Sequence, residues 1–144
     1  FKKILVPTDG SEVGAKAAAT AAQMAKESGG EVVGVYVIDP FPYIGIGDAS
    51  AVGLQAYLSD AKRMAGEALE AVAQTCRAQG VPFAGDTIER NLVWEGILET
   101  AKAEHCDLVV MGSHGRQGVK ALILGSVAQK VPTHAELPVM IVKG

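Results

Sequence analysis

Five short apolar runs, separated by segments with helical periodicity, limit the fold of this chain more than any other feature. The runs are 4–6, 32–38, 83–88, 108–111 and 139–142. The second and fourth are apolar throughout, as in parallel strands that helices cover on both faces. The third contains Gly85 and Asp86, which favour an edge strand. This alternation predicts an α/β fold with a doubly wound, open, five-stranded parallel sheet and helices on both faces.

Helical spacing of apolar residues marks the segments between these runs. The segments are 11–27, about 50–79, 92–104 and 126 to about 131. Glycines follow the first two, and we expect Pro132 to end the last one, because proline disfavours helical geometry in the residue before it. The 144 residues match the usual size of one domain, so we expect a single domain over 1–144.

Charge and composition narrow the classes of partner. The formal net charge of -3 and a pI near 5.6 argue against nucleic-acid binding, which uses a basic surface. No apolar run reaches the roughly 20 residues of a membrane span, and no signal peptide is recognisable. We therefore expect a cytoplasmic protein without a membrane partner. Cys76 and Cys106 lack zinc-binding spacing, which predicts two free thiols in a reducing compartment.

The carboxyl ends of the strands are where doubly wound sheets bind ligands. That rule selects three segments, 7–10, 38–39 and 112–115. The segment 40–47 leaves from the same end of the sheet. It is apolar yet rich in proline and glycine, and it fits a packed loop, a lid or a partner surface.

A glycine pattern follows the fourth strand. Two residues separate Gly112 from Gly115, and nine more precede Gly125, which stands directly before Ser126. Glycines let the main chain approach a phosphate, and the start of a helix offers N–H groups to an anion. Two interpretations without a ligand stay open: a simple turn at the glycines, and a capping box formed by Ser126 and Gln129.

The same pattern resembles the ATP-binding signature of the universal stress protein family. The likeness extends to 3–12, 37–39 and 134–142, and it therefore spans nearly the whole chain. It implies the strand order 3-2-1-4-5 and bound ATP, or ADP or AMP in its place, together with Mg²⁺. It also implies a homodimer that pairs through the edge strand Val139–Val142. It supplies no catalytic residue and no protein ligand for a metal.

The resemblance implies a role for each residue that matches the family pattern. Asp9 and the main chain of Val37 face the adenine and ribose, and Pro7 and Met111 form apolar walls. Arg116 neutralises phosphate charge. The residues that hold ribose and phosphates, mostly through the main chain, are Gly112, His114, Gly115, Gly125, Ser126 and Val127. Asp9 also fits the N-cap of the first helix, and His114 also fits a surface histidine without a role.

Two positions depart from the family pattern. Asn91 replaces a usual glycine, and asparagine tolerates the positive φ that such a turn would need. Pro132 stands where the family continues its last helix, which is a second reason to expect a short helix there. Neither departure touches the glycine pattern.

Together these features predict an ATP-binding regulatory protein of the stress response, whose nucleotide occupancy tunes dimer or partner interactions. Slow ATP hydrolysis in the same site is one alternative. The chain lacks the P-loop lysine motif and shows no nucleophile–base pair, so we expect at most a weak ATPase. A nucleotide-free dimeric interaction module, with an unknown protein partner, is a further alternative. Receiver and flavodoxin-like modules share the fold class, but their motifs after the first strand are missing.

Overall fold

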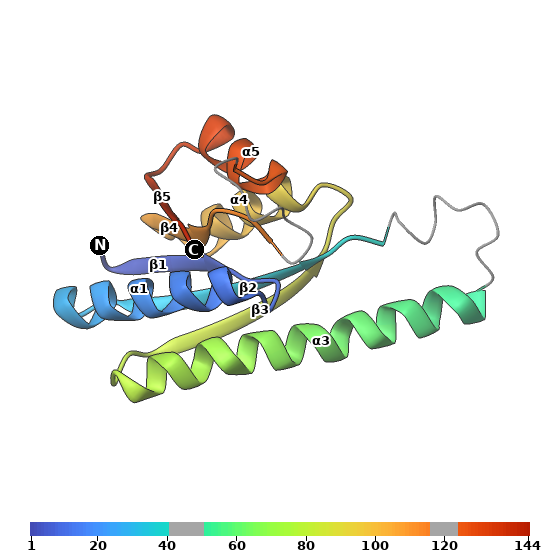
Figure 1. Ribbon diagram of the computed structural model, residues 1–144, viewed down its shortest axis with the longest axis horizontal. Coiled ribbons are helices and arrows are strands. Elements are labelled where there is room, and N and C mark those ends of the chain that lie inside the picture. Colours follow the sequence, from blue (N-terminus) through green and yellow to red (C-terminus); the bar gives the residue numbers. More distant parts are fainter. Residues whose placement is uncertain (41–50, 116–123) are drawn as a thin grey trace.

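The sheet is built as the sequence predicts. The computed structural model describes residues 1–40, 51–115 and 124–144. Its strands are β1 (Lys3–Pro7), β2 (Glu31–Ile38), β3 (Phe83–Glu89), β4 (Leu108–Gly112) and β5 (Val139–Val142). All neighbouring pairs are parallel, in the order β3-β2-β1-β4-β5 (Figure 1). The five strands and their order are confirmed, and β3 lies at an edge as expected.

Helices cover both faces of the sheet. Those among the described residues are α1 (Glu12–Ser28), α3 (Ala51–Ala78), α4 (Val93–Ala103) and α5 (Ser126–His134). Helices α1 and α3 lie on one face, and α4 and α5 on the other (Figure 1). Side chains of β1 alternate between the two layers: Ile4 and Val6 pack with α1 and α3, whereas Leu5 packs with α4 and α5. Because both faces are buried, the central strands are apolar without alternation.

Helix α3 is longer than the strands that it covers. Its 28 residues extend roughly 42 Å, whereas the 8 residues of β2 extend roughly 26 Å. Among the α3 side chains that the structure describes, the buried ones begin at Ala65. The N-terminal half of α3 therefore projects past the carboxyl ends of the strands (Figure 1). This position brings Met64, one residue earlier, to the ligand end of the sheet.

Helix α5 does not end before Pro132, and that prediction is wrong. The helix continues to His134 with the proline inside it. A proline removes one main-chain hydrogen bond, but other contacts hold the last turn. Val131 is fully buried, the Thr133 hydroxyl donates to the Gln129 carbonyl (2.7 Å), and the His134 ring stacks on Trp94 of α4 with 4.2 Å between centroids. Packing between α4 and α5 thus outweighs the local effect of the proline.

The turn before α4 does not use a left-handed asparagine. Among the described residues, the one non-glycine residue with positive φ is His105, at 57°. It follows α4, where the N–H of Cys106 donates to the carbonyl of Ala101 (2.8 Å) and the N–H of His105 donates to that of Lys102 (3.2 Å). This is a Schellman ending, a place that normally favours glycine. The positive φ is thus found at His105, after α4, and not at Asn91, before it.

The two cysteines are unpaired thiols, as the sequence predicts. Cys76 is buried and Cys106 is partly buried. Burial raises the pKa of the Cys76 thiol, and burial is also the main reason that the pKa of Cys106 rises to about 11. Within residues 1–40, 51–115 and 124–144, no helix combines the length and the apolar character needed to cross a membrane.

Candidate functional site

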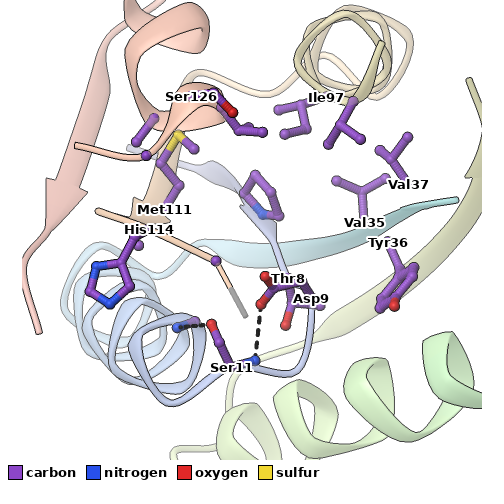
Figure 2. A pocket seen from close by; sticks show the side chains of 18 of the residues that line it. Thr8, Asp9, Ser11, Val35, Tyr36, Val37, Ile97, Met111, His114 and Ser126 are labelled. Atoms are coloured by element: carbon purple, nitrogen blue, oxygen red, sulfur yellow. Dashed lines mark hydrogen bonds between the residues drawn. The ribbon is translucent and has the colours of Figure 1, made fainter. Parts of the chain in front are cut away.

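A cavity of about 740 Å³ opens at the carboxyl ends of the strands. Its walls come from the ends of β1, β2 and β4, from the first turns of α1 and α5, and from one side each of α3 and α4 (Figure 2). This is the end of the sheet that the topology rule selects. The N-termini of α1 and α5 both face the cavity, so helix N–H groups and two positive dipole ends are directed toward one space.

The structure brings together every predicted site residue that it describes. Pro7, Asp9 and Val37 line the cavity from β1, the turn after it, and β2. Met111, Gly112, His114 and Gly115 line it from β4 and the following turn, and Gly125, Ser126 and Val127 from the start of α5. Arg116 lies outside the described residues, as does most of the segment 40–47.

Asp9 and Gly115 meet at this cavity. A Cβ atom on Gly115 would collide with Oδ2 of Asp9, so only glycine lets the carboxylate and this stretch of main chain come so close. The other carboxylate oxygen, Oδ1, accepts a hydrogen bond from the Ser11 N–H at 2.9 Å. The carboxylate is therefore held between the start of α1 and the glycine turn after β4.

Asp9 is not the N-cap of α1, and that interpretation is corrected. The cap is Ser11, whose hydroxyl oxygen accepts from the Gly14 N–H at 3.2 Å. Asp9 stands two residues earlier and closes an Asx turn through the Ser11 N–H. Since Ser11 caps the helix, the Asp9 carboxylate can turn toward the cavity instead.

Ser126 and Gln129 do not form a capping box. Gly125 occupies the N-cap of α5 without a side-chain cap, and Ser126 is the first helical residue. The Gln129 amide reaches back to the Leu124 carbonyl instead, at 2.6 Å. The Ser126 side chain is exposed at the cavity. The capping box therefore does not explain this serine.

The main chain of Ser113 ties the glycine turn to its surroundings. Its N–H donates to the Val142 carbonyl in β5 (2.9 Å), and its carbonyl accepts from the Gly125 N–H (2.8 Å). The Ser113 hydroxyl lies 3.1 Å from Nδ1 of His114. Figure 2 shows the His114 ring turned away from the apolar side chains of the cavity, so His114 contributes mainly its main chain.

One part of the cavity, which we call the apolar chamber, lies on the α4 side of the sheet. It is formed by Val35, Val37, Val93, Ile97 and Met111. Figure 2 shows Val35, Val37, Ile97 and Met111 grouped on the same side of β2. Such a space suits a flat, apolar ring.

The main chain of Val37 faces this cavity. The Thr8 N–H donates to the Val35 carbonyl (2.9 Å), which places the polar groups of Val35 on the β1 side. The Arg90 N–H donates to the Ile38 carbonyl (3.0 Å), which places those of Ile38 on the β3 side. Since these directions alternate along a strand, the N–H and C=O of Val37 point to the β1 side, beyond the end of β1.

A second part of the cavity, which we call the polar chamber, lies on the α1 and α3 side. Thr8, Ser11, Gly14, Tyr36 and Met64 form it. The sequence assigned none of the five a role in the site, although Thr8 lies in the selected segment 7–10, and Ser11 and Tyr36 adjoin selected residues. The contributions of α3 and α4 carry no local signal, because only tertiary packing brings these helices to the strand ends.

The charge of the lining is simple in the part of the chain that the structure describes. Asp9 is the one carboxylate among those lining residues, and no lysine or arginine joins it. In the same residues no group of three or more histidine, cysteine or carboxylate side chains could hold a metal ion. A negatively charged ligand would thus be held by N–H groups and hydroxyls.

Comparison with known proteins accounts for this combination of sheet and glycine turn. The sequence profile of the Universal stress protein family matches residues 1–143. The chain belongs to the universal stress protein family. It is 38% identical over 144 residues to the universal stress protein MJ0531 of Methanocaldococcus jannaschii, an alignment that covers 99% of this chain and 82% of that protein.

Solved structures of the universal stress protein family share the fold. The structure of hypothetical protein MJ0577, of the same organism, has a TM-score of 0.86 at 26% identity, and covers 100% of this chain and 96% of that one. The universal stress protein of Archaeoglobus fulgidus, solved in complex with dAMP, has a TM-score of 0.70 at 23% identity and covers 99% and 98% of the two chains. At 23% identity, the similarity to the second structure supports the fold alone.

Proposed function

We propose that this universal stress protein binds ATP, and that nucleotide occupancy tunes its contacts with a second copy or with a protein partner in the stress response. One observation carries the proposal. Asp9, the main chain of Val37, the glycine turn and the N-terminus of α5 all face a single cavity.

The phosphates belong at the glycine turn and the start of α5. Gly112, Gly115 and Gly125 carry no side chains, so an anion can lie close to the main chain here, although the Gly125 N–H itself is bonded to the Ser113 carbonyl. The first N–H groups of α5 and its dipole favour negative charge, and Ser126 adds a hydroxyl donor. Asp9 would repel phosphates, so they lie on the α5 side of the cavity.

The base belongs in the apolar chamber. Its walls are Val35, Ile97 and Met111, which bury a flat ring, and the main chain of Val37 supplies an N–H next to a C=O. Adenine presents an amino donor beside ring-nitrogen acceptors, whereas guanine presents an oxygen acceptor at the same position. A carbonyl at the strand edge therefore favours adenine. The dAMP complex of the Archaeoglobus fulgidus protein is consistent with an adenine nucleotide in this family.

Mg²⁺ would arrive with the nucleotide. Among the lining residues that the structure describes, Asp9 is the single carboxylate. Magnesium commonly keeps several waters and binds through phosphates with one or two carboxylates. Phosphate oxygens would then take the place of most of the protein ligands that a dedicated metal site needs.

Slow hydrolysis is the second candidate function. In the described part of the cavity, Asp9 is the one carboxylate and His114 the one histidine; Oδ1 of Asp9 accepts from the Ser11 N–H, and Nδ1 of His114 lies 3.1 Å from the Ser113 hydroxyl. This arrangement lacks an evident base for an attacking water. Turnover far below the range of roughly 1–10³ s⁻¹ for typical enzymes is the expected result.

Strand β5 is the proposed dimer surface. It forms an edge of the sheet, and Met140 on it is 36% exposed. The carbonyls of Pro138 and Val142 accept from β4, so the polar main-chain groups of Val139 and Ile141 face away from it. An edge of this kind is open to pairing with a second copy. If no nucleotide binds, a nucleotide-free dimeric module remains as the third candidate.

Nucleotide content of freshly purified protein tests the proposal. After denaturation, ion-exchange analysis of the supernatant should give near-stoichiometric adenine nucleotide, and calorimetric titration of nucleotide-free protein with ATP and Mg²⁺ should give a saturable signal. The Gly115→Ala/Ser126→Ala double variant should lose both. Gly66→Ala is the matched control, because a Cβ there has no neighbour within 4 Å. If the wild-type protein contains no nucleotide and also gives no heat on titration, ATP binding is excluded.

A further inference from the structure

Strand β3 forms the edge of the sheet opposite to β5 (Figure 1). It pairs with β2 along one side, where the Val32 N–H donates to the Pro82 carbonyl at 3.0 Å. Since main-chain directions alternate along a strand, the even-numbered residues of β3 face β2. The N–H and C=O groups of Phe83, Gly85 and Thr87 therefore point away from the sheet.

This edge has little of the protection that sheet edges usually carry. Lysine, proline or a very short strand commonly prevents pairing at an edge. Strand β3 has 7 residues, against 4 in β5, and its stretch Phe83–Glu89 contains no lysine, arginine or proline. Gly85 and Thr87 are exposed. The Arg90 guanidinium donates to the Glu89 carbonyl (2.7 Å), so the open stretch ends before Glu89.

The side chain of Asp86 gives the α4 face of this edge a negative charge. It lies on that face because Ile88, two residues further along β3, packs in the α4 layer. Burial raises the pKa of Asp86, the carboxylate of Glu104 raises it further, and Lys3 lowers it. Lys3 itself forms an ion pair with Glu31, at 3.8 Å. A lysine or arginine brought against Asp86 would therefore be stabilised.

The α3 face of the same edge is apolar. Gly85 has no side chain, and the Phe83 ring and Cδ1 of Leu69 lie within 4 Å of the position that its Cβ would take. Phe83 and Leu69 are both partly exposed. An apolar side chain on a neighbouring strand, opposite Gly85, would cover both of them. Because side chains alternate, the residues on either side of it would point to the Asp86 face.

A second copy of the chain fits this edge poorly. Antiparallel pairing of two β3 strands centred on Asp86 would place the two carboxylates directly opposite each other, which is destabilising. Pairing centred one residue away would leave them diagonal neighbours. The charge therefore favours a different, basic partner.

We propose that the β3 edge binds an extended segment of a basic partner protein, which joins the sheet as a further strand. Side chains of that segment would alternate between basic residues, on the Asp86 face, and apolar residues, over Gly85. The inference does not depend on nucleotide binding, because none of the residues 83–89 lines the cavity.

A capped peptide of the same length as β3, in which lysine and valine alternate, is the probe. In titrations followed by NMR of the isotope-labelled protein, the amide signals of Phe83, Gly85 and Thr87 should shift and their hydrogen exchange should slow, while those of β5 stay unchanged. A peptide with glutamate in place of lysine should bind at least about tenfold more weakly, because it would bring like charges together.

Variants of β3 test charge and main-chain pairing separately. Asp86→Asn should weaken the lysine peptide by roughly two- to fivefold, the usual effect of one cross-strand pair of opposite charge. Asp86→Lys should reverse the preference, so that the glutamate peptide binds better. Thr87→Pro removes an outward N–H and should weaken binding at least about tenfold, and an edge strand tolerates proline at such a position. Thr87→Val keeps the N–H and is the matched control.

Several results would overturn this proposal: no binding of the lysine peptide, equal binding of the glutamate peptide, or shifts on β5 in place of β3. Unchanged affinity in a folded Thr87→Pro protein would do so as well. Self-association that Thr87→Pro abolishes would show that a second copy occupies the edge, and would also overturn it. If Thr87→Pro does not fold, the amide signals and Asp86→Lys still decide. Failure here leaves the nucleotide site untouched, since ATP binding is measured independently.

Discussion

The carboxylate of Asp9 lies so close to Gly115 that a single methyl group on the glycine would displace it. These residues come from the turns after β1 and β4, which are adjacent strands in the sheet. The contact joins the glycine turn to the start of α1 through the hydrogen bond from the Ser11 N–H to Asp9. The affinity of any ligand that touches both turns should therefore depend on this pair.

Gly115→Ala should weaken ATP binding by at least about tenfold, or about 1.4 kcal/mol. The added methyl group pushes the Asp9 carboxylate into the cavity or moves the glycine turn. Stability should change little, since Gly115 does not have the positive φ that would strain alanine. Titration calorimetry measures the first effect and urea denaturation the second, with Gly66→Ala as control. Unchanged affinity in a folded Gly115→Ala protein would contradict the assignment of this pair to the site.

Ser126→Ala should lower ATP affinity by roughly 5- to 10-fold, the usual effect of one lost hydrogen bond of about 1 kcal/mol. Protein stability should stay within about 0.5 kcal/mol, because the N-cap of α5 is Gly125 and Ser126 caps nothing. A true capping serine would instead reduce stability by about 1 kcal/mol. Urea denaturation of the nucleotide-free protein distinguishes these cases. If Ser126→Ala lost stability but kept its affinity for ATP, the role of Ser126 would be structural.

Met140→Lys should convert the proposed dimer to a monomer. Met140 lies on the edge strand β5 and is 36% exposed. Lysine on an edge strand discourages pairing with another strand, because the pairing would bury its charge. Sedimentation velocity at several protein concentrations measures the change. A dimer that survives the substitution would place the interface on another surface.

His105→Gly should stabilise the protein by up to about 1 kcal/mol. His105 has φ of 57°, a left-handed conformation in which a Cβ is unfavourable, and it ends α4 in a Schellman motif. Glycine has no Cβ, although its greater freedom in the unfolded chain offsets part of the gain. His105→Ala keeps the Cβ and should show no gain. The midpoints of urea denaturation rank the three proteins, and a less stable glycine variant would refute the argument.

Alkylation of Cys106 should be slow in the folded protein at pH 8. Burial raises the pKa of its thiol from 9.0 to about 11, while Lys3 acts in the opposite sense. The thiolate is the reactive form, so iodoacetamide should react roughly 100-fold more slowly than with the unfolded chain. Mass spectrometry of peptides separates Cys106 from Cys76. Equal rates in folded and unfolded protein would show that the pKa is not raised.

The same shift has a consequence for stability. Because the folded-state pKa of Cys106 is the higher one, its contribution is complete below pH 9.0 and is lost as the pH rises toward about 11. The free energy of unfolding should therefore decrease over this range. Part of the decrease should disappear in Cys106→Ser, whose hydroxyl does not titrate there.

The strands and most helix ends are predictable from local pattern. Uninterrupted apolar runs mark β2 and β4, and Gly29 ends α1 in a left-handed conformation, with φ of 68°. The extent of α5 is not predictable in this way. Its last turn depends on buried Val131 and on the stacking of His134 against Trp94, a residue of another helix. The rule that proline ends a helix considers only neighbouring residues, and therefore takes no account of these tertiary contacts.

Site prediction divides along the same line. The sheet and the three strand-end segments of the site follow from local sequence, because hydrophobic period and glycine spacing are properties of neighbouring residues. Tertiary structure alone decided that Ser11, and not Asp9, caps α1, and that Gly115 meets Asp9. It alone brought Met64 and Ile97 to the cavity. Such contacts depend on how far each helix extends past the sheet, and that is set by packing along whole elements.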